Sequence, residues 1–137
     1  MIRYKQFFPR KEKPMKLLLV KQVFLRQVGN TSPYEAFIKS ILENLGPKFE
    51  IEIAETAEEA EKIIAADSQR KFSAVLFASQ AMIVKAIGIG ENFPQIKFLI
   101  FCGCLENDRH QSQNVYLIKK DPGGIRHWQI AEQIMTA

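Results

Sequence analysis

The side chains best placed to do chemistry follow two short apolar runs, which end near residues 78 and 102. Ser79 comes directly after the first run, and Cys102 closes the second. Either would need a neighbouring base to act as a nucleophile, and no Gly-x-Ser-x-Gly motif surrounds Ser79. We expect both histidines, His110 in a polar loop and His127 on the last helix, to lie on the surface. The chain is therefore predicted not to be an enzyme, and a small enzyme that uses Ser79 or Cys102 is kept as a third alternative.

A metal site is the second chemistry that these residue types suggest. Cys102, Cys104, Asp108 and His110 lie within nine residues, and cysteine and histidine are common zinc ligands. Their Cys-x-Cys spacing differs from the Cys-x-x-Cys of most zinc sites, and the sequence has no second ligand pair. The sequence therefore predicts neither a metal site nor another cofactor.

Hydrophobic patterning indicates the strands that position these residues. Short runs rich in Val, Ile, Leu and Phe are typical of strands that are buried on both faces of a parallel sheet. The run at 49–53 alternates apolar and acidic residues, which favours a half-exposed edge strand. The stretch 105–114 is polar and has no apolar periodicity, so we expect a loop there. Strands are predicted at 16–20, 49–53, 72–78, 96–102 and 115–118.

Helix signals separate most of these strands. The segments 32–35 and 56–59 read Ser-Pro-Tyr-Glu and Thr-Ala-Glu-Glu, which are patterns of helix starts. A third helix is expected around 82–87 and to end at Gly88 and Gly90, and a last helix follows the turn at 121–124. This alternation predicts an α/β fold, a three-layer αβα sandwich of the flavodoxin-like or Rossmann-like kind. Its five-stranded parallel sheet is expected in the order 2-1-3-4-5.

The carboxyl edge of that sheet is the expected site of recognition, because ligands of such folds usually bind beyond the carboxyl ends of the strands. The helix that follows residues 79–80 could supply free N–H groups there. An anion could also be held where Gly123 and Gly124 precede the last helix, with Lys119 and Lys120 just upstream. A plain loop-to-helix turn is the favoured interpretation of that segment.

Length and charge suggest one domain with a basic extension. The chain has 137 residues and a formal net charge of +4. The segment 1–14 holds five basic residues, one acidic residue and Phe7-Phe8-Pro9, so we interpret it as a flexible or surface-lying extension of a domain at 15–137. Basic residues elsewhere are dispersed, which disfavours a nucleic acid partner. No apolar run is long enough to span a membrane, so we expect a cytoplasmic location.

The layout and strand lengths resemble a response-regulator receiver domain. That family has an acidic pair after the first strand, a phosphoacceptor aspartate after the third, and Ser or Thr after the fourth. Here Lys-Gln, Ala-Ser and Cys-Gly stand at 21–22, 78–79 and 102–103, and only a lysine after the fifth strand remains, as Lys119 or Lys120. The resemblance implies at most a pseudo-receiver, a signalling module that lacks the phosphoacceptor and works by protein contact.

The chain also resembles, over about residues 16–137, the N-terminal lobe of periplasmic-binding-type proteins, in particular the basic membrane protein family of nucleoside-binding lipoproteins. The likeness rests on the loop and helix at 29–46, on Pro-Gln-Ile-Lys-Phe at 94–98, and on Lys-Asp-Pro-Gly-Gly at 120–124. Those proteins clamp a ligand between two lobes, whereas one lobe presents half a cleft that a second copy or a partner chain would complete. The ligand contacts that the resemblance implies are Asn30, Ser79, Gln80, Cys102, Gly103 and Asp121.

The sequence thus predicts a non-catalytic binding or regulatory domain. It would recognise a small polar ligand or a protein partner at the carboxyl edge of the sheet, either alone or as a homodimer. The pseudo-receiver is the first alternative, and it would use a face near the last strand and helix.

Overall fold

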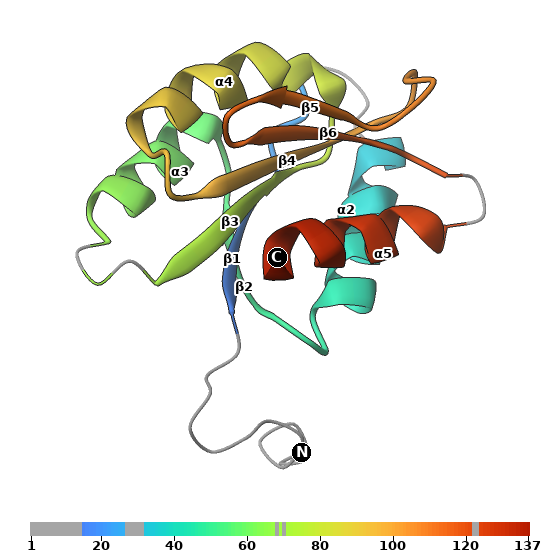
Figure 1. Ribbon diagram of the computed structural model, residues 1–137, viewed down its shortest axis with the longest axis horizontal. Coiled ribbons are helices and arrows are strands. Elements are labelled where there is room, and N and C mark those ends of the chain that lie inside the picture. Colours follow the sequence, from blue (N-terminus) through green and yellow to red (C-terminus); the bar gives the residue numbers. More distant parts are fainter. Residues whose placement is uncertain (1–14, 27–31, 68, 70, 122–123) are drawn as a thin grey trace.

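One mixed sheet lies between two layers of helices in the computed structural model, which describes residues 15–26, 32–67, 69, 71–121 and 124–137 (Figure 1). Helices α3 and α4 cover one face of the sheet, and α2 and α5 cover the other. The predicted α/β class and its layers are therefore confirmed, while the extension at 1–14 lies outside the described residues. The elements are β1 (Lys16–Val20), α2 (Ser32–Leu45), β2 (Glu50–Ala54), α3 (Ala57–Ala65), β3 (Phe72–Phe77), η1 (Gln80–Met82), α4 (Ile83–Asn92), β4 (Lys97–Cys102), β5 (Arg109–Ser112), β6 (Val115–Lys119) and α5 (Arg126–Thr136).

The sheet has six strands in the described part of the chain, in the order β2-β1-β3-β4-β6-β5. The five predicted strands pair in parallel and in the predicted order. The sixth, β5, pairs antiparallel with β6 at the sheet edge. The prediction of a five-stranded, wholly parallel sheet was therefore wrong at this edge.

Strand β5 falls inside the stretch that was expected to be a loop. All four of its residues are exposed, so neither face of the strand produces an apolar pattern in the sequence. Backbone pairing with β6 holds it in place, together with the ring of His110, which stacks on Tyr116 at a centroid distance of 4.4 Å. Hydrophobic periodicity cannot reveal a strand of this kind.

The central strands are buried on both faces, as their apolar runs predict. In β1, Leu18 and Val20 pack against the α3–α4 layer, while Leu17 and Leu19 pack against the α2–α5 layer. This alternation follows from the two-residue period of side chains along a strand. The sheet is therefore the shared wall of two hydrophobic cores.

Helix α4 continues through Gly88 and Gly90, so the predicted stop at these glycines was wrong. Gly88 has open space around it, whereas a Cβ atom on Gly90 would lie 3.3 Å from Asn114 Oδ1 and 3.3 Å from a methyl group of Val115. The glycine at position 90 thus allows the helix to approach the start of β6 closely.

The end of α4 is fastened by the buried side chain of Asn114. Its Nδ2 donates within hydrogen-bond distance of the carbonyl oxygens of Gly90, Phe93 and Ile96, at 3.1, 3.0 and 2.8 Å. These include carbonyl groups that the last turn of a helix leaves without a partner. One amide therefore stops the helix and positions the chain for β4.

The start of α3 has the predicted capping pattern, except that the glutamate bonds to the residue before the N-cap Thr56. The Thr56 hydroxyl accepts a hydrogen bond from the Glu59 N–H at 3.1 Å, and Glu59 Oε1 accepts one from the Glu55 N–H at 2.8 Å. Helix α2 begins at Ser32, whose side chain lies outside the described structure. None of the helices in the described ranges is long and apolar enough to cross a bilayer.

Candidate functional site

The strand register brings most of the predicted site residues to one edge of the sheet. Phe77 of β3 pairs with Ile100 of β4, and Cys102 of β4 pairs with Lys119 of β6. The residues that follow these strands, including Ser79 and Asp121, therefore line the carboxyl edge together. Asn30 and Gly123 lie outside the described residues, so their predicted roles there stay predictions.

Ser79 is held in a structural role. Its side chain is buried, and its hydroxyl oxygen accepts a hydrogen bond from the Ala81 N–H at 3.2 Å, which caps η1. One of the N–H groups at the start of this helix, that of Ala81, is thus already used within the chain. Gln80, by contrast, is exposed at this edge.

Gln22 occupies the switch point between β1 and β3, where the sheet order reverses. It is 5% exposed; its side-chain nitrogen donates to the Leu25 carbonyl at 3.1 Å, and its oxygen accepts from the Ala57 N–H at 2.9 Å. The amide thereby ties the exit of β1 to the first turn of α3. A polar residue directly after a buried strand is the signal in the sequence that could have identified this position.

The two cysteines have different surroundings. Cys102 is buried, and burial raises the pKa of its thiol to about 11, while Cys104 is exposed. Gly103 between them is exposed and has open space where a side chain would stand. In the ranges that the structure describes, no three Cys, His, Asp or Glu side chains gather in a way that could hold a metal ion.

Lys120 rests on two aromatic rings of α2. Its ammonium group lies 4.2 Å from the ring centroid of Phe37 and 5.2 Å from that of Tyr34. Burial lowers the pKa of Lys120, although the neighbouring thiols act in the opposite direction. The backbone N–H of Lys119, meanwhile, donates to Asp108 Oδ1 at 2.8 Å. Both lysines to which the receiver resemblance points, Lys119 and Lys120, thus make contacts within the fold.

His127 was expected on the surface, and the structure corrects this because the residue is 3% exposed. Its Nδ1 accepts a hydrogen bond from the Asp121 N–H at 2.9 Å, so the neutral ring carries its proton on Nε2. That second nitrogen has no hydrogen-bond partner in the described part of the chain. Burial lowers the pKa of His127. The last helix was predicted from the sequence, but the burial of His127 on it was not.

The turn before α5 differs from the predicted anion site. Gly124 has a φ of +75°, and its N–H donates to the Asp121 carbonyl at 2.8 Å. Helix α5 begins only at Arg126, so Gly124 is not among the first residues of the helix. The left-handed conformation at Gly124 explains the need for glycine there.

A small hollow of about 150 Å³ lies beside this turn. Asp108 forms an ion pair with Arg126 at its side. Burial of Asp108 acts to raise the pKa of its carboxyl group, but the hydrogen bonds from Arg126 and from the Lys119 N–H outweigh it and lower the pKa. The hollow is lined by Glu106, Asn107, Lys119, Asp121 and Arg126.

A larger groove opens at the carboxyl edge and continues between α3 and α4. Its volume is about 550 Å³. Two large aliphatic side chains on its walls are mostly exposed, Val84 at 80% and Leu25 at 63%. Val84 could have been noticed in the sequence, because it falls outside the spacing of the buried α4 positions 86, 89 and 90. The groove is lined by Leu25, Glu61, Ala81, Val84, Lys85, Gly88 and Ile89.

Comparisons with known proteins give a likeness of fold. No family model and no curated protein matches the sequence. Among solved structures, the lysine decarboxylase LdcF of Francisella novicida superposes with a TM-score of 0.61 and 8% identity, covering 91% of this chain and 17% of the decarboxylase. The "putative lipoprotein from Peptoclostridium difficile 630 (fragment)" superposes with a TM-score of 0.55 and 14% identity, covering 87% of this chain and 98% of that fragment. This chain thus spans only a small part of the decarboxylase, and both likenesses concern the α/β fold alone.

Proposed function

We propose that this chain is a non-catalytic binding domain that recognises a protein partner through the α3–α4 groove. The observation that carries the proposal is the pair of exposed aliphatic side chains, Val84 and Leu25, on the walls of one hollow of about 550 Å³. Exposed apolar surface gathered in this way is typical of interaction sites. The groove opens at the carboxyl edge, where the sequence predicts recognition.

The charges beside the groove favour a partner segment that carries aliphatic residues flanked by basic ones. Helix α3 contributes Glu58, Glu59 and Glu61 against one basic residue, Lys62. Lys85 of α4 forms an ion pair with Glu58, so its charge is largely balanced within the chain. Electrostatic complementarity chiefly improves specificity and the rate of association. A basic flank would meet the acidic balance that remains on this wall.

A protein partner is supported over a small polar ligand by the lining of the α3–α4 groove, which is mostly apolar, and by the small size of the other hollow at this edge. Pockets for small ligands usually measure roughly 300–1,000 Å³, whereas the hollow beside Asp121 measures about 150 Å³. At the switch point, Gln22 makes hydrogen bonds to the chain itself. Both observations leave little room at the carboxyl edge except in the α3–α4 groove.

The states of Ser79 and Cys102 support the non-catalytic part of the proposal. The Ser79 hydroxyl accepts from the Ala81 N–H, which is a capping role. A catalytic cysteine normally has a lowered pKa, whereas burial raises the pKa of Cys102 to about 11. The thiol is therefore protonated at neutral pH.

The pseudo-receiver alternative shares the protein partner but places it near the last strand and helix. Ile125, which directly precedes α5, is 66% exposed and is the corresponding candidate contact there. The two versions therefore differ in which exposed aliphatic residue the partner covers.

A titration of the 137-residue chain, monitored by NMR, separates these versions. The probe is a synthetic amphipathic helix of leucine and lysine, and a leucine and glutamate helix of the same length is its control. We expect the basic probe to shift the resonances of α3 and α4, and Val84→Asp to abolish this while Ile125→Asp leaves it unchanged. Val84 and Ile125 are similarly exposed, so the two variants are matched.

The opposite pattern, with Ile125→Asp abolishing binding, would favour the pseudo-receiver face. Equal binding of both peptides would contradict the proposed role of the acidic wall. A saturable response to nucleosides or sugars at Gln80 and Gly103, without any response to the peptides, would overturn the protein-binding proposal in favour of a small ligand.

A further inference from the structure

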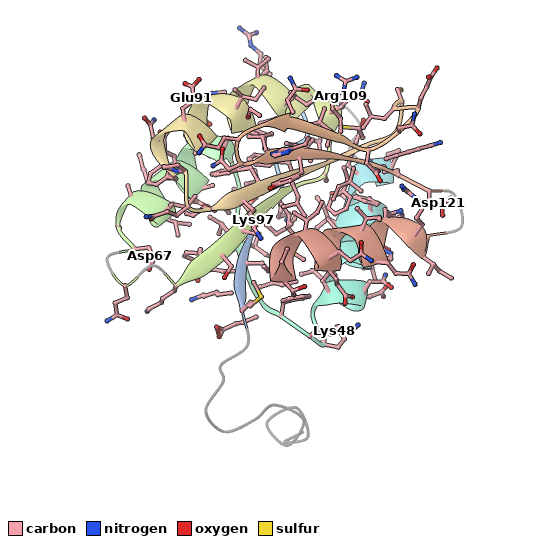
Figure 2. All side chains as sticks on the ribbon, viewed as in Figure 1. Lys48, Asp67, Glu91, Lys97, Arg109 and Asp121 are labelled. Carbon is pink, nitrogen blue, oxygen red and sulfur yellow. The ribbon has the colours of Figure 1, made fainter. Side chains whose placement is uncertain are left out.

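A hydrogen bond to His127 links the exit of β6 to the start of α5. Asp121 comes just after β6 and lies near the first turn of α5 (Figure 2). Its backbone N–H donates to Nδ1 of His127, the second residue of α5, at 2.9 Å. The bond thus fastens the end of a sheet strand to the helix that covers this face of the sheet.

This hydrogen bond requires a neutral imidazole ring. A neutral ring has one nitrogen that accepts and one that donates, whereas both nitrogens of a protonated ring are donors. On protonation, the Asp121 N–H would therefore point at another N–H group. Turning the ring by half a turn gives no acceptor either, because it brings a ring carbon to the same place. Protonation of His127 thus removes the bond in either orientation of the ring.

The packing around His127 offers no replacement for the lost bond. The residue is buried, and its ring faces Phe37 of α2 and Phe101 of β4 at centroid distances of 5.8 and 6.0 Å. These neighbours are hydrocarbon rings without a carbonyl or carboxylate acceptor. In the described part of the chain, Nε2 already lacks a hydrogen-bond partner. A protonated ring that stayed in place would therefore bury two N–H groups without acceptors, which is costly.

The charges that act on His127 come from the strand exit and from its own helix. Lys120 and Arg126 disfavour a charged ring, and the carboxylate of Asp121 favours it. The positive end of the helix dipole, at the first turn of α5, also acts against a cation. Burial is the largest influence and lowers the pKa of His127. A proton on this ring is therefore accommodated best when the ring leaves its site.

We infer that His127 is a proton-operated switch, in which protonation of the ring breaks the bond to Asp121 and loosens the junction of β6 and α5 while the sheet stays folded. The sheet keeps its own bonds, because the Lys120 N–H donates to the Cys102 carbonyl at 2.9 Å. The far end of α5 is held separately by Lys97, whose ammonium donates to the Ile134 carbonyl at 2.6 Å.

The remaining link near the switch is weak enough to permit this opening. Arg126 forms an ion pair with Asp108, and both side chains are partly exposed. Ion pairs exposed to solvent contribute little to stability. The switch lies on the opposite face of the sheet from the α3–α4 groove, so the inference goes beyond the proposed function.

Amide exchange of the 137-residue chain, followed by NMR at about pH 8 and about pH 5, tests the inference. Nitrogen-15 shifts of the ring report the protonation state of His127. We expect the Asp121 N–H to be protected at the higher pH. Its protection factor, which corrects for the intrinsic pH dependence of exchange, should fall about tenfold for each pH unit below the folded-state pKa of His127. Amides of β3 and β4 should stay protected.

His127→Asn is the matched variant. Its side-chain oxygen stands near the place of Nδ1 and does not take up a proton in this range, so we expect Asp121 to stay protected at both pH values. His127→Phe fills the site of the ring without an acceptor, and Asp121 should be unprotected at both. An acid-induced loss in His127→Asn equal to that of the native chain would assign the effect to another group and overturn the inference.

The native chain alone also decides the question if a variant fails to fold. Protection of Asp121 that persists while the ring shifts show a protonated His127 would overturn the inference, as would a ring that is still neutral at about pH 5. An equal loss of protection in β3 and β4 would indicate global unfolding and would also overturn it. None of these readouts involves Val84, so failure here leaves the proposed function untouched.

Discussion

The two helical layers cover the same sheet in different ways. On the α2–α5 side, aromatic rings pack against one another. The ring centroid of Phe37 lies 5.4 Å from that of Phe101 and 5.5 Å from that of Trp128, and the centroids of His127 and Trp128 are 4.3 Å apart. Lys120 extends the cluster, with its ammonium over Phe37. Large side chains therefore fill the space between these helices and the sheet.

On the α3–α4 side the large rings come from the sheet, as Phe72, Phe77 and Phe98, whereas several of the buried helix residues are small. Ala57, Ala60, Ala86 and Gly90 are buried there. Such residues let the helices lie close to the sheet, but they cannot fill the space between the outer flanks of the two helices. Val84 is consequently left 80% exposed beside the groove. The comparison is consistent with a division in which the α2–α5 side chiefly stabilises the fold and the α3–α4 side carries the binding surface that we propose.

The largest expected difference between the two sides concerns stability. Trp128→Ala removes a buried ring from the aromatic cluster, and we expect it to lower the free energy of unfolding by about 3–5 kcal/mol. Denaturation by urea measures this. Val84→Ala on the other side should change stability by less than about 0.5 kcal/mol. Similar losses in both variants would contradict the division of roles.

Asn114 tests how firmly the open side is fastened. Asn114→Ala removes the side-chain donor that the carbonyl groups of Gly90, Phe93 and Ile96 share, although the first two keep a backbone N–H donor. We expect a loss of about 1–3 kcal/mol. Asn44→Ala is the control, because Asn44 is exposed and donates only within its own helix, to Ser40. A loss no larger than that of the control would show that α4 does not depend on this amide.

Acid should weaken the aromatic side selectively. Burial lowers the pKa of His127 in the folded chain, so its protonation favours the unfolded state. Its contribution is fully present above the unfolded-state value of about 6.5 and is lost as the pH falls below it. His127→Phe should remove this contribution to the dependence of unfolding midpoints on pH. A profile unaffected by His127→Phe would contradict the assignment.

The smallest expected effects come from the two glycines of α4. Gly88→Ala adds a methyl group in open space and should stabilise the chain by about 0.5–1 kcal/mol. Gly90→Ala places the same group 3.3 Å from Asn114 and Val115, and we expect a net loss of about 1 kcal/mol. Thermal unfolding of both variants provides the measurement. If both were stabilising, the close approach of α4 to β6 would not constrain position 90.

Most of the fold could be predicted because burial leaves a pattern in the sequence. The apolar runs of β1, β3 and β4 reflect strands covered on both faces, and the Thr56–Glu59 pattern reflects a local hydrogen bond. Strand β5 escaped prediction because exposed residues held by backbone pairing leave no such pattern. The end of α4 escaped it because Asn114 acts from 22 residues further along the chain than Asn92.

The candidate site was less predictable than the fold. The carboxyl edge could be located from the strand ends, but the sequence did not reveal that Ser79 caps η1 or that Gln22 fills the switch point. Nor did it identify the groove at Val84, whose walls come from two helices and from the residues after β1. These features depend on which side chains of different helices and strands come into contact. The hydrophobic periodicity of a single helix or strand does not tell which other elements it will contact.

The sequence by itself therefore determined the α/β class, the parallel order of five strands, and the chemistry available at their ends. These follow from local propensity and from the periods of single elements. Only the tertiary structure decided that His127 is buried, that Cys102 is a protonated thiol, and that the open surface lies between α3 and α4. The reason is physical: burial and pKa are set by neighbours distant in the chain, which meet only when the two layers close on the sheet.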